Sequence, residues 1–297
     1  MTPIVCPAKL AKLLVCTDGS ADSHGAFAAA LDLAHSCGSQ IYLIQVLTFN
    51  PEFEALAPEV IEDWEKEVRE NLEALKAEAL QRGVTVETLV RRSESPYTAI
   101  IQEINRLQPD TVIIGRHGHK GISRVMMGSV TARVVGLSPK DVLVVPRHAA
   151  MALDRILLAT DGSKYSKFAT QRAIEFVKRG GGELNVVYVS DVPPGFYTYV
   201  PGAERVLLDE AQGYMDEVVK QAERNSIAPI PFLKEGEAFE EITKLARERK
   251  ANLIIMGSHG RTGFKKLLMG SVTEKVIGNA TCPVLVVKAE HPEAGLA

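Results

Sequence analysis

Short apolar runs alternate along the chain with longer segments in which apolar residues recur every three to four positions. Such runs between turn residues indicate buried strands, and the longer spacing indicates amphipathic helices. We expect strands at residues 13–16, 41–46, 84–90, 111–114 and 142–145, and again at 156–159, 184–189, 229–233, 253–256 and 284–287. Strands that are apolar on both faces and alternate with helices predict parallel sheets covered on both sides. The expected fold class is α/β, with two tandem doubly wound, Rossmann-like domains.

The clearest helical pattern covers residues 58–82, and Gly83 is its expected stop. Trp64 lies on the apolar side of this pattern, so we expect it in the core. Ser95 followed by Pro96 is typical of the start of a further helix. Doubly wound sheets bind ligands at the carboxyl ends of their strands, near the point where the strand order reverses.

The chain repeats itself. KLLVCTDGS at residues 12–20 returns as RILLATDGS at 155–163, and GRHG at 115–118 returns as GSHG at 257–260. MGSVT at 127–131 returns at 269–273, and VLVV at 142–145 returns at 284–287. Two copies of one domain are therefore expected, at residues 1–148 and 152–297, and the period is far too long for a solenoid.

Composition and charge exclude several classes of function. The formal net charge of the 297 residues is −3, and no dense run of Lys or Arg is present, so we expect no nucleic-acid partner. No apolar stretch is long enough to span a bilayer, and the first residues lack a signal-peptide pattern. The four cysteines match no zinc or CxxC spacing, a usage that fits a reducing compartment. We expect a cytoplasmic protein.

An aspartate follows the first predicted strand of each half, at Asp18 and Asp161, and Gly-Ser comes next. A carboxylate at this edge could accept hydrogen bonds from ribose hydroxyls or hold a divalent metal. Aspartate and serine are also good helix N-cap residues, so capping is an alternative interpretation that does not exclude the first.

A spaced set of glycines follows the fourth predicted strand of each half. Glycine allows the backbone to approach phosphate oxygens and to adopt positive φ, and the next helix would offer its N-terminus to an anion. The pattern is neither a Walker loop nor GxGxxG. The alternative interpretation is that these glycines only form turns, but this is less favoured because the same set occurs at the same place in both halves. The residues are Gly115, Gly118 and Gly128-Ser129-Val130, with Gly257, Gly260 and Gly270-Ser271-Val272.

Val46 and Val189 end the second predicted strand of each half. Their main-chain groups could pair with the edge of an adenine, although a core valine is the default interpretation.

Together these features resemble the universal stress protein family, over nearly the whole chain and twice. The Thr-Asp-Gly-Ser turn and the G-x2-G-x9-G-S spacing carry the resemblance, and the second half, with GSHGRTG at 257–263 and TCPVLVV at 281–287, is the closer match. The resemblance implies an open, mostly parallel five-stranded sheet in each half. It also implies ATP, or ADP or AMP, at each glycine set. The aspartates would face the ribose or a nucleotide-bound magnesium ion, the valines adenine, and the glycines and serines the phosphates.

Partners follow from the same resemblance. It implies pairing of the last strands, at 142–145 and 284–287, as an intramolecular pseudo-dimer. Both runs are apolar, and exposed edges of this kind tend to be paired. A homodimer of the whole chain and an unidentified protein partner are further expectations.

The first half departs from the family pattern where His119 and Lys120 replace Arg261 and Thr262, so equivalence of the two sites is in doubt. His117 and His119 alone are too few for a zinc site. No nucleophile and base constellation is visible, and nothing poises a general base for attack of water on ATP. We expect a regulatory nucleotide-binding protein without fast catalysis. A slow ATPase or another nucleotide-dependent enzyme, and a scaffold for a non-nucleotide ligand, are the alternatives.

Overall fold

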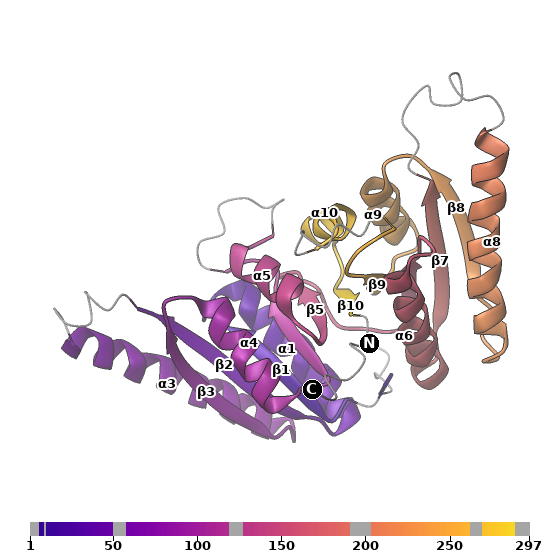
Figure 1. Cartoon of the computed structure of the whole chain (residues 1–297). Helices are drawn as coiled ribbons and strands as arrows, with labels where there is room; N and C mark the ends of the chain where they lie inside the picture. The colour runs from indigo at the N-terminus through magenta and orange to yellow at the C-terminus, as the bar shows by residue number, and fades with distance from the viewer. Residues whose placement is uncertain are drawn as a thin grey trace, which may run out of the picture. The chain divides into compact units, whose positions relative to one another are not determined.

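The computed structural model describes residues 6–8, 10–49, 58–118, 127–190, 203–261 and 269–288. The chain divides into two compact units, one formed by Lys9–Ala150 and the other by Met151–Ala297 together with Met1–Ala8. Each unit is an α/β structure and is described by itself (Figure 1).

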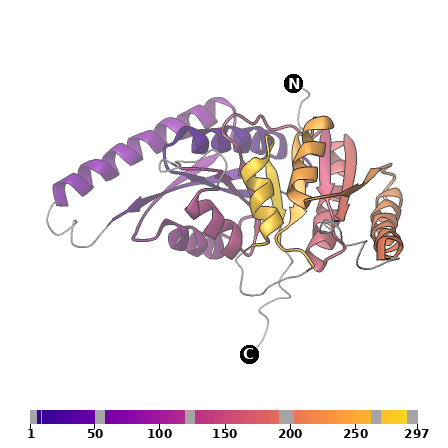
Figure 2. The same ribbon diagram turned by 90° about the horizontal axis from the view of Figure 1, so that it is seen from above.

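The first unit is a parallel sheet in the strand order β3-β2-β1-β4-β5. Helices α1 and α3 cover one face of this sheet, and α4 packs beside α5 on the other (Figures 1 and 2). The order reverses between β1 and β4, whose carboxyl ends therefore flank the position expected for a ligand. The elements are β1 (Lys12–Thr17), α1 (Ala21–Cys37), β2 (Gln40–Thr48), α3 (Pro58–Gln81), β3 (Val86–Ser93), α4 (Pro96–Leu107), β4 (Thr111–Gly115), α5 (Ser129–Leu137) and β5 (Asp141–Val145).

The second unit repeats this arrangement, with the parallel strand order β8-β7-β6-β9-β10. Helices α9 and α10 pack side by side, while α6 and α8 contact the strands from the other side (Figures 1 and 2). The elements are β6 (Arg155–Ala159), α6 (Lys164–Gly180), β7 (Glu183–Ser190), α8 (Ala203–Glu223), β8 (Ile230–Glu235), α9 (Ala238–Glu248), β9 (Leu253–Gly257), α10 (Ser271–Asn279) and β10 (Val284–Val287).

The fold class predicted from the apolar pattern is confirmed, and each predicted strand is present with small shifts of its ends. The third strand begins at Val86, two residues later than expected, because Val84 instead closes the turn that follows α3. There Val84 N donates to the carbonyl of Ala79 over 3.0 Å.

Trp64 is not a core residue, and this expectation was wrong. Its side chain is 40% exposed, although Ile61, Val68 and Leu72 on the same helix are buried. Ile61 lies nearer the start of α3 and is buried, so the position of Trp64 along the helix does not explain its exposure. At 3.6 residues per turn, Trp64 lies roughly 60° around the helix from Ile61, on the side of the exposed Val60, and therefore at the flank of the buried face.

The cysteines differ from the expectation of reduced thiols. Cys16 and Cys282 are free and buried, but Cys6 and Cys37 are disulfide-bonded. In the part of the chain that the structure describes, no helix combines the length and the apolar character needed to cross a membrane.

Candidate functional site

The aspartate turns at the ends of β1 and β6 have the same geometry. Ser20 N donates to Asp18 Oδ1 over 3.0 Å, and Ser163 N donates to Asp161 Oδ1 over 3.0 Å. The two serines are the N-caps of α1 and α6, and their hydroxyls accept from the main chain of the first helical turn. The aspartates thus shape the turns while the serines cap the helices. Each carboxylate keeps acceptor capacity for a ligand hydroxyl.

The intervening glycines of these turns are the ones that need a left-handed backbone. Gly19 has φ 80° and Gly162 has φ 77°, conformations that glycine adopts without steric cost. Sequence reasoning assigned positive φ to the glycine sets instead. That was wrong, because none of the six glycines of those sets has such a φ.

Neighbouring atoms lie close to several glycines of the two sets, and this explains why glycine is needed there. A Cβ on Gly115 would lie 3.0 Å from the main chain of Asp22, and one on Gly118 would lie 2.4 Å from Asp18 Oδ2. A Cβ on Gly128 would lie 3.4 Å from the carbonyl oxygen of Arg116. The second unit repeats these contacts at Gly257 (2.8 Å from Tyr165), Gly260 (2.8 Å from Asp161 Oδ2) and Gly270 (3.4 Å from His259). Side chains are therefore excluded at the first two glycines of each set, whereas a Cβ on the third would make only an ordinary van der Waals contact.

Helices α5 and α10 begin without a side-chain cap. Their N-cap residues are Gly128, with φ −60° and ψ 144°, and Gly270, with φ −67° and ψ 141°. The first N–H groups of a helix have no partner within the helix. Serine satisfies one of them at the start of α1 and α6, but a glycine cannot do so. The N-termini of α5 and α10 therefore present main-chain donors and a positive dipole end to an anion.

A buried hydroxyl fixes each of these helices to the adjacent strand. Thr131 Oγ1 donates to the carbonyl of Gly115 over 2.8 Å, and Thr273 Oγ1 donates to that of Gly257 over 3.0 Å. Gly128 N donates to the carbonyl of Arg116 over 2.9 Å, and this bond joins the start of α5 to the residue that follows β4. These hydrogen bonds thus fix the N-terminus of each helix at the end of the adjacent strand.

In the second unit, the candidate residues line one cavity of about 140 Å³. All seven second-half candidates contribute to it: Asp161, Val189, Gly257, Gly260, Gly270, Ser271 and Val272. The remaining lining residues are Ala159, Thr160, Ser166, Val187, Ala238, Ile242, Met256, His259 and Thr273. The cavity thus joins an apolar wall from β7, β9 and α9 to a polar rim from the turn and the N-terminus of α10.

The valine positions are neither fully buried nor exposed. Val46 lies near the end of β2 and Val189 near the end of β7, and both are partly accessible. Val189 lines the cavity together with Val187, and this places an apolar surface there for a flat aromatic ligand. The default interpretation of Val189 as a purely core residue does not hold.

The first unit has a more charged surrounding. His117 Nδ1 lies 3.6 Å from Asp22 Oδ1, and burial lowers the pKa of Arg116, against the influence of the nearby Asp22 carboxylate. At the corresponding places, the second unit has His259 beside the Tyr165 ring, at 5.0 Å between ring centroids. His119 and Lys120, which the sequence singled out, lie outside the described residues. Among the described residues, no group of three His, Cys, Asp or Glu could hold a metal ion.

Comparison with known proteins identifies the family. The sequence profile of the universal stress protein family matches residues 10–146 and, again, residues 152–288. This chain belongs to the universal stress protein family. The resemblance seen in the sequence is thereby confirmed, and the chain carries two copies of the family's domain.

Two relatives illustrate the membership. Universal stress protein MJ0531 of Methanocaldococcus jannaschii is 38% identical over 151 residues, 50% of this chain and 89% of that protein. A universal stress protein of Mycolicibacterium smegmatis is 32% identical over 221 residues, 69% of this chain and 70% of that protein. The crystal structure of a universal stress protein from Archaeoglobus fulgidus matches with a TM-score of 0.70 at 24% identity, covering 93% of this chain and 98% of that chain, which shows the shared fold.

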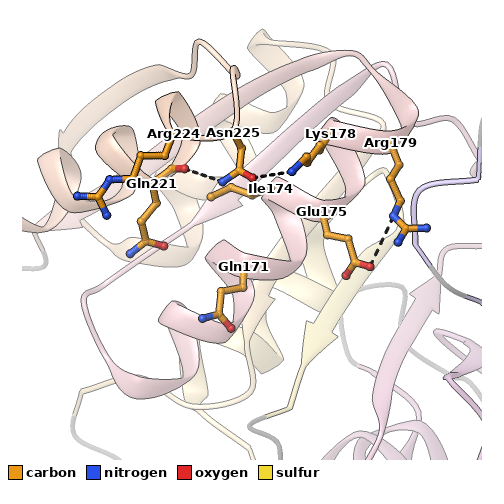
Figure 3. Close-up of a pocket in the computed structure, with 8 residues that line it drawn as sticks. All are labelled: Gln171, Ile174, Glu175, Lys178, Arg179, Gln221, Arg224 and Asn225. Atoms are coloured by element: carbon orange, nitrogen blue, oxygen red, sulfur yellow. Dashed lines mark hydrogen bonds and ion pairs between the residues drawn. The ribbon is translucent and has the colours of Figure 1, made fainter.

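A larger hollow in the second unit of this universal stress protein lies away from the candidate residues. It measures about 700 Å³ and lies between α6 and α8 (Figure 3). Lys178 Nζ donates to Asn225 Oδ1 over 3.0 Å across it, and Arg179 is paired with Glu175. The other lining residues are Gln171, Ile174, Gln221 and Arg224. Because its walls are mainly long polar side chains of two surface helices, we place the candidate site at the glycine sets.

Sequence reasoning missed a cluster beside the second site. Tyr188 on β7 and Glu210 and Tyr214 on α8 converge on the guanidinium of Arg261. Only Tyr188 carried a sequence signal, since it precedes Val189. The two residues of α8 are distant in sequence from every family motif.

Proposed function

We propose that each unit binds an adenine nucleotide, with ATP as the ligand, at the carboxyl end of its sheet. One observation carries this proposal: in both units a glycine-capped helix N-terminus lies beside glycines that have no room for a side chain. This combination supplies main-chain donors and close access, which are what phosphate groups require.

The residues of the cavity fit the parts of the ligand. The phosphates would lie against the main chain of Gly128-Ser129-Val130 in the first unit and Gly270-Ser271-Val272 in the second. Adenine would lie against the apolar wall that includes Val189, with Val46 at the corresponding place. The ribose hydroxyls would donate to Asp18 and Asp161. A magnesium ion brought by the nucleotide would neutralise phosphate charge, and these two carboxylates would be its nearest protein ligands.

We infer a regulatory, binding function in the stress response rather than rapid turnover. Hydrolysis needs a base within reach of the attacking water. In the second unit, Asp161 already accepts from Ser163 N and from Arg261 N, each over 3.0 Å, and its carboxylate therefore holds the turn and the glycine segment. A carboxylate used in this way is better suited to fixing a ligand than to moving protons.

Equilibrium dialysis of the full chain against millimolar Mg-ATP tests the proposal. We expect up to two nucleotides per chain, and mass spectrometry of ligand released from freshly purified, denatured protein should find an adenine nucleotide. Absence of binding in dialysis by protein that carries no nucleotide after purification would contradict the proposal.

A further inference from the structure

Arg261 follows Gly260 in the second glycine set, and its guanidinium is held by α8 and β7. Nη1 donates to Tyr188 Oη over 3.2 Å, and Nη2 donates to Tyr214 Oη over 3.1 Å. Nη2 also forms an ion pair with Glu210. The side chain is therefore held by Glu210 and Tyr214 of α8 and by the Tyr188 hydroxyl of β7.

Two aromatic rings hold this arrangement in place. Tyr188 and Tyr214 stack with ring centroids 6.2 Å apart and an interplanar angle of 11°, and Arg261 Cζ lies 5.0 Å from the Tyr214 centroid. Desolvation lowers the pKa of Arg261, but the hydrogen bond to Tyr214 and the negative charge of Glu210 are among the interactions that outweigh it and raise that pKa. The guanidinium stays charged and prefers an anionic partner.

The cluster lies directly beside the candidate site. Arg261 N donates to Asp161 Oδ2 over 3.0 Å, and a Cβ on Gly162 would lie 2.3 Å from the Tyr214 ring. Gly260 N lies 3.6 Å from the position that a Cβ would take on Gly270, the N-cap of α10. An arginine side chain is longer than this separation. The guanidinium can therefore reach the anion-binding end of α10 once it leaves α8.

The first unit lacks the cluster. Gln45 precedes Val46, where Tyr188 precedes Val189. Helix α3 of the first unit can be aligned with α8 of the second, because the turns that follow them match. In these turns Val84 N donates to the Ala79 carbonyl and Ile227 N donates to the Ala222 carbonyl, each over 3.0 Å. By this alignment Glu67 takes the place of Glu210, and Asn71 takes the place of Tyr214. The carboxylate is thus retained without either aromatic partner.

We propose that Glu210 competes with the phosphates of a nucleotide for Arg261, so that Arg261 makes the second site selective for ligands with several phosphates. The inference rests on the proposed function and adds a specificity-determining pair to one of its two sites. A polyphosphate offers several oxygens to the planar guanidinium and more negative charge than one carboxylate. Glu210 therefore weakens binding of charged nucleotides, and the first site is free of this competition.

The expected change in ATP affinity follows from the solvent exposure of the ion pair between Arg261 and Glu210. The side chains of Arg261 and Glu210 are 37% and 39% exposed, and ion pairs at such positions are weak. Removing the carboxylate should tighten ATP binding about two- to five-fold. Loss of Arg261 should act in the opposite direction.

Calorimetric titration of the full chain tests this in a Ser129→Glu background, in which a negative charge at α5 removes the first site. Glu210→Gln should tighten ATP binding, have a smaller effect on AMP and leave adenosine unchanged. Arg261→Gln should weaken ATP binding and abolish the effect of Glu210→Gln. Glu67→Gln is the matched control, since it removes the corresponding carboxylate of the other unit, and it should change nothing.

The outcomes separate the two proposals. If the Ser129→Glu parent binds no nucleotide, the proposed function fails for the second site and this inference falls with it. If the parent binds ATP but Glu210→Gln has no effect, or if Glu210→Gln changes ATP and adenosine equally, only the competition is overturned. Thermal unfolding of each variant distinguishes a loss of binding from a loss of fold.

Discussion

Replacing Ser271 by glutamate should remove the second nucleotide site without harming the fold. Ser271 is the first residue of α10 and is exposed, so the longer side chain meets no steric barrier. A carboxylate in the first turn of a helix stabilises the helix by about 0.3–1 kcal/mol. The same charge would lie next to the donors that we assign to the phosphates.

The expected loss of affinity follows from placing two negative charges at the same helix N-terminus. A glutamate at the first position of α10 would be a near neighbour of a phosphate held by the first N–H groups of that helix, and we take a separation of roughly 4 Å. Two unit charges at that distance repel by about 1 kcal/mol in water and about 4 kcal/mol near a protein surface. Because about 1.4 kcal/mol is a factor of ten, we expect the affinity for ATP to fall by roughly 5- to 1000-fold.

Equilibrium dialysis with Mg-ATP is the assay, and Ser271→Gln is the matched control because it has the same length without the charge. Ser129→Glu makes the same change in the first unit. We expect each glutamate variant to lose one nucleotide per chain, the double variant to lose both, and the glutamine variant to keep both. Wild-type stoichiometry and affinity in Ser271→Glu would refute the placement of phosphate at α10, and an equal loss in Ser271→Gln would refute the electrostatic reasoning.

Three further predictions concern stability and reactivity. Thr273→Val removes the buried hydrogen bond to the Gly257 carbonyl and should lower the free energy of unfolding by about 1–3 kcal/mol in urea titrations; a change within error would show that this bond contributes nothing. Desolvation raises the pKa of the Glu103 carboxyl, but hydrogen bonds from two arginines outweigh it and lower that pKa in the folded state. The resulting stabilisation is therefore present above about pH 4.3 and is lost as pH falls through the folded pKa, so acid titration of Glu103→Gln should show a flatter loss of stability than the wild type. Burial raises the pKa of the thiols of Cys16 and Cys282 to about 12, and a thiol reagent at pH 8 should modify them only after denaturation, whereas rapid reaction of the native protein would contradict this burial.

Local sequence patterns predicted most of the fold because the features concerned are themselves local. Apolar runs between turn residues are sufficient to recognise a buried strand, and Ser95-Pro96 is sufficient to recognise the start of α4. The spacing of the glycine sets likewise indicated where a strand ends and a helix begins. The exposure of Trp64 could not be predicted in this way, because Trp64 lies at the flank of the apolar face of α3, and only the packing of the helix decides how much of that flank is covered.

The sequence by itself determined that the chain has two copies of one α/β domain, and that each copy places an aspartate and a glycine set at the same edge of a parallel sheet. Strand order and chain direction impose that edge. Only the tertiary structure decided what each residue does there. It showed that the glycine sets serve close approach, that positive φ belongs to Gly19 and Gly162, and that Glu210 meets Arg261. These contacts join segments far apart in sequence, so their geometry depends on how helices pack against the sheet and carries no local signal.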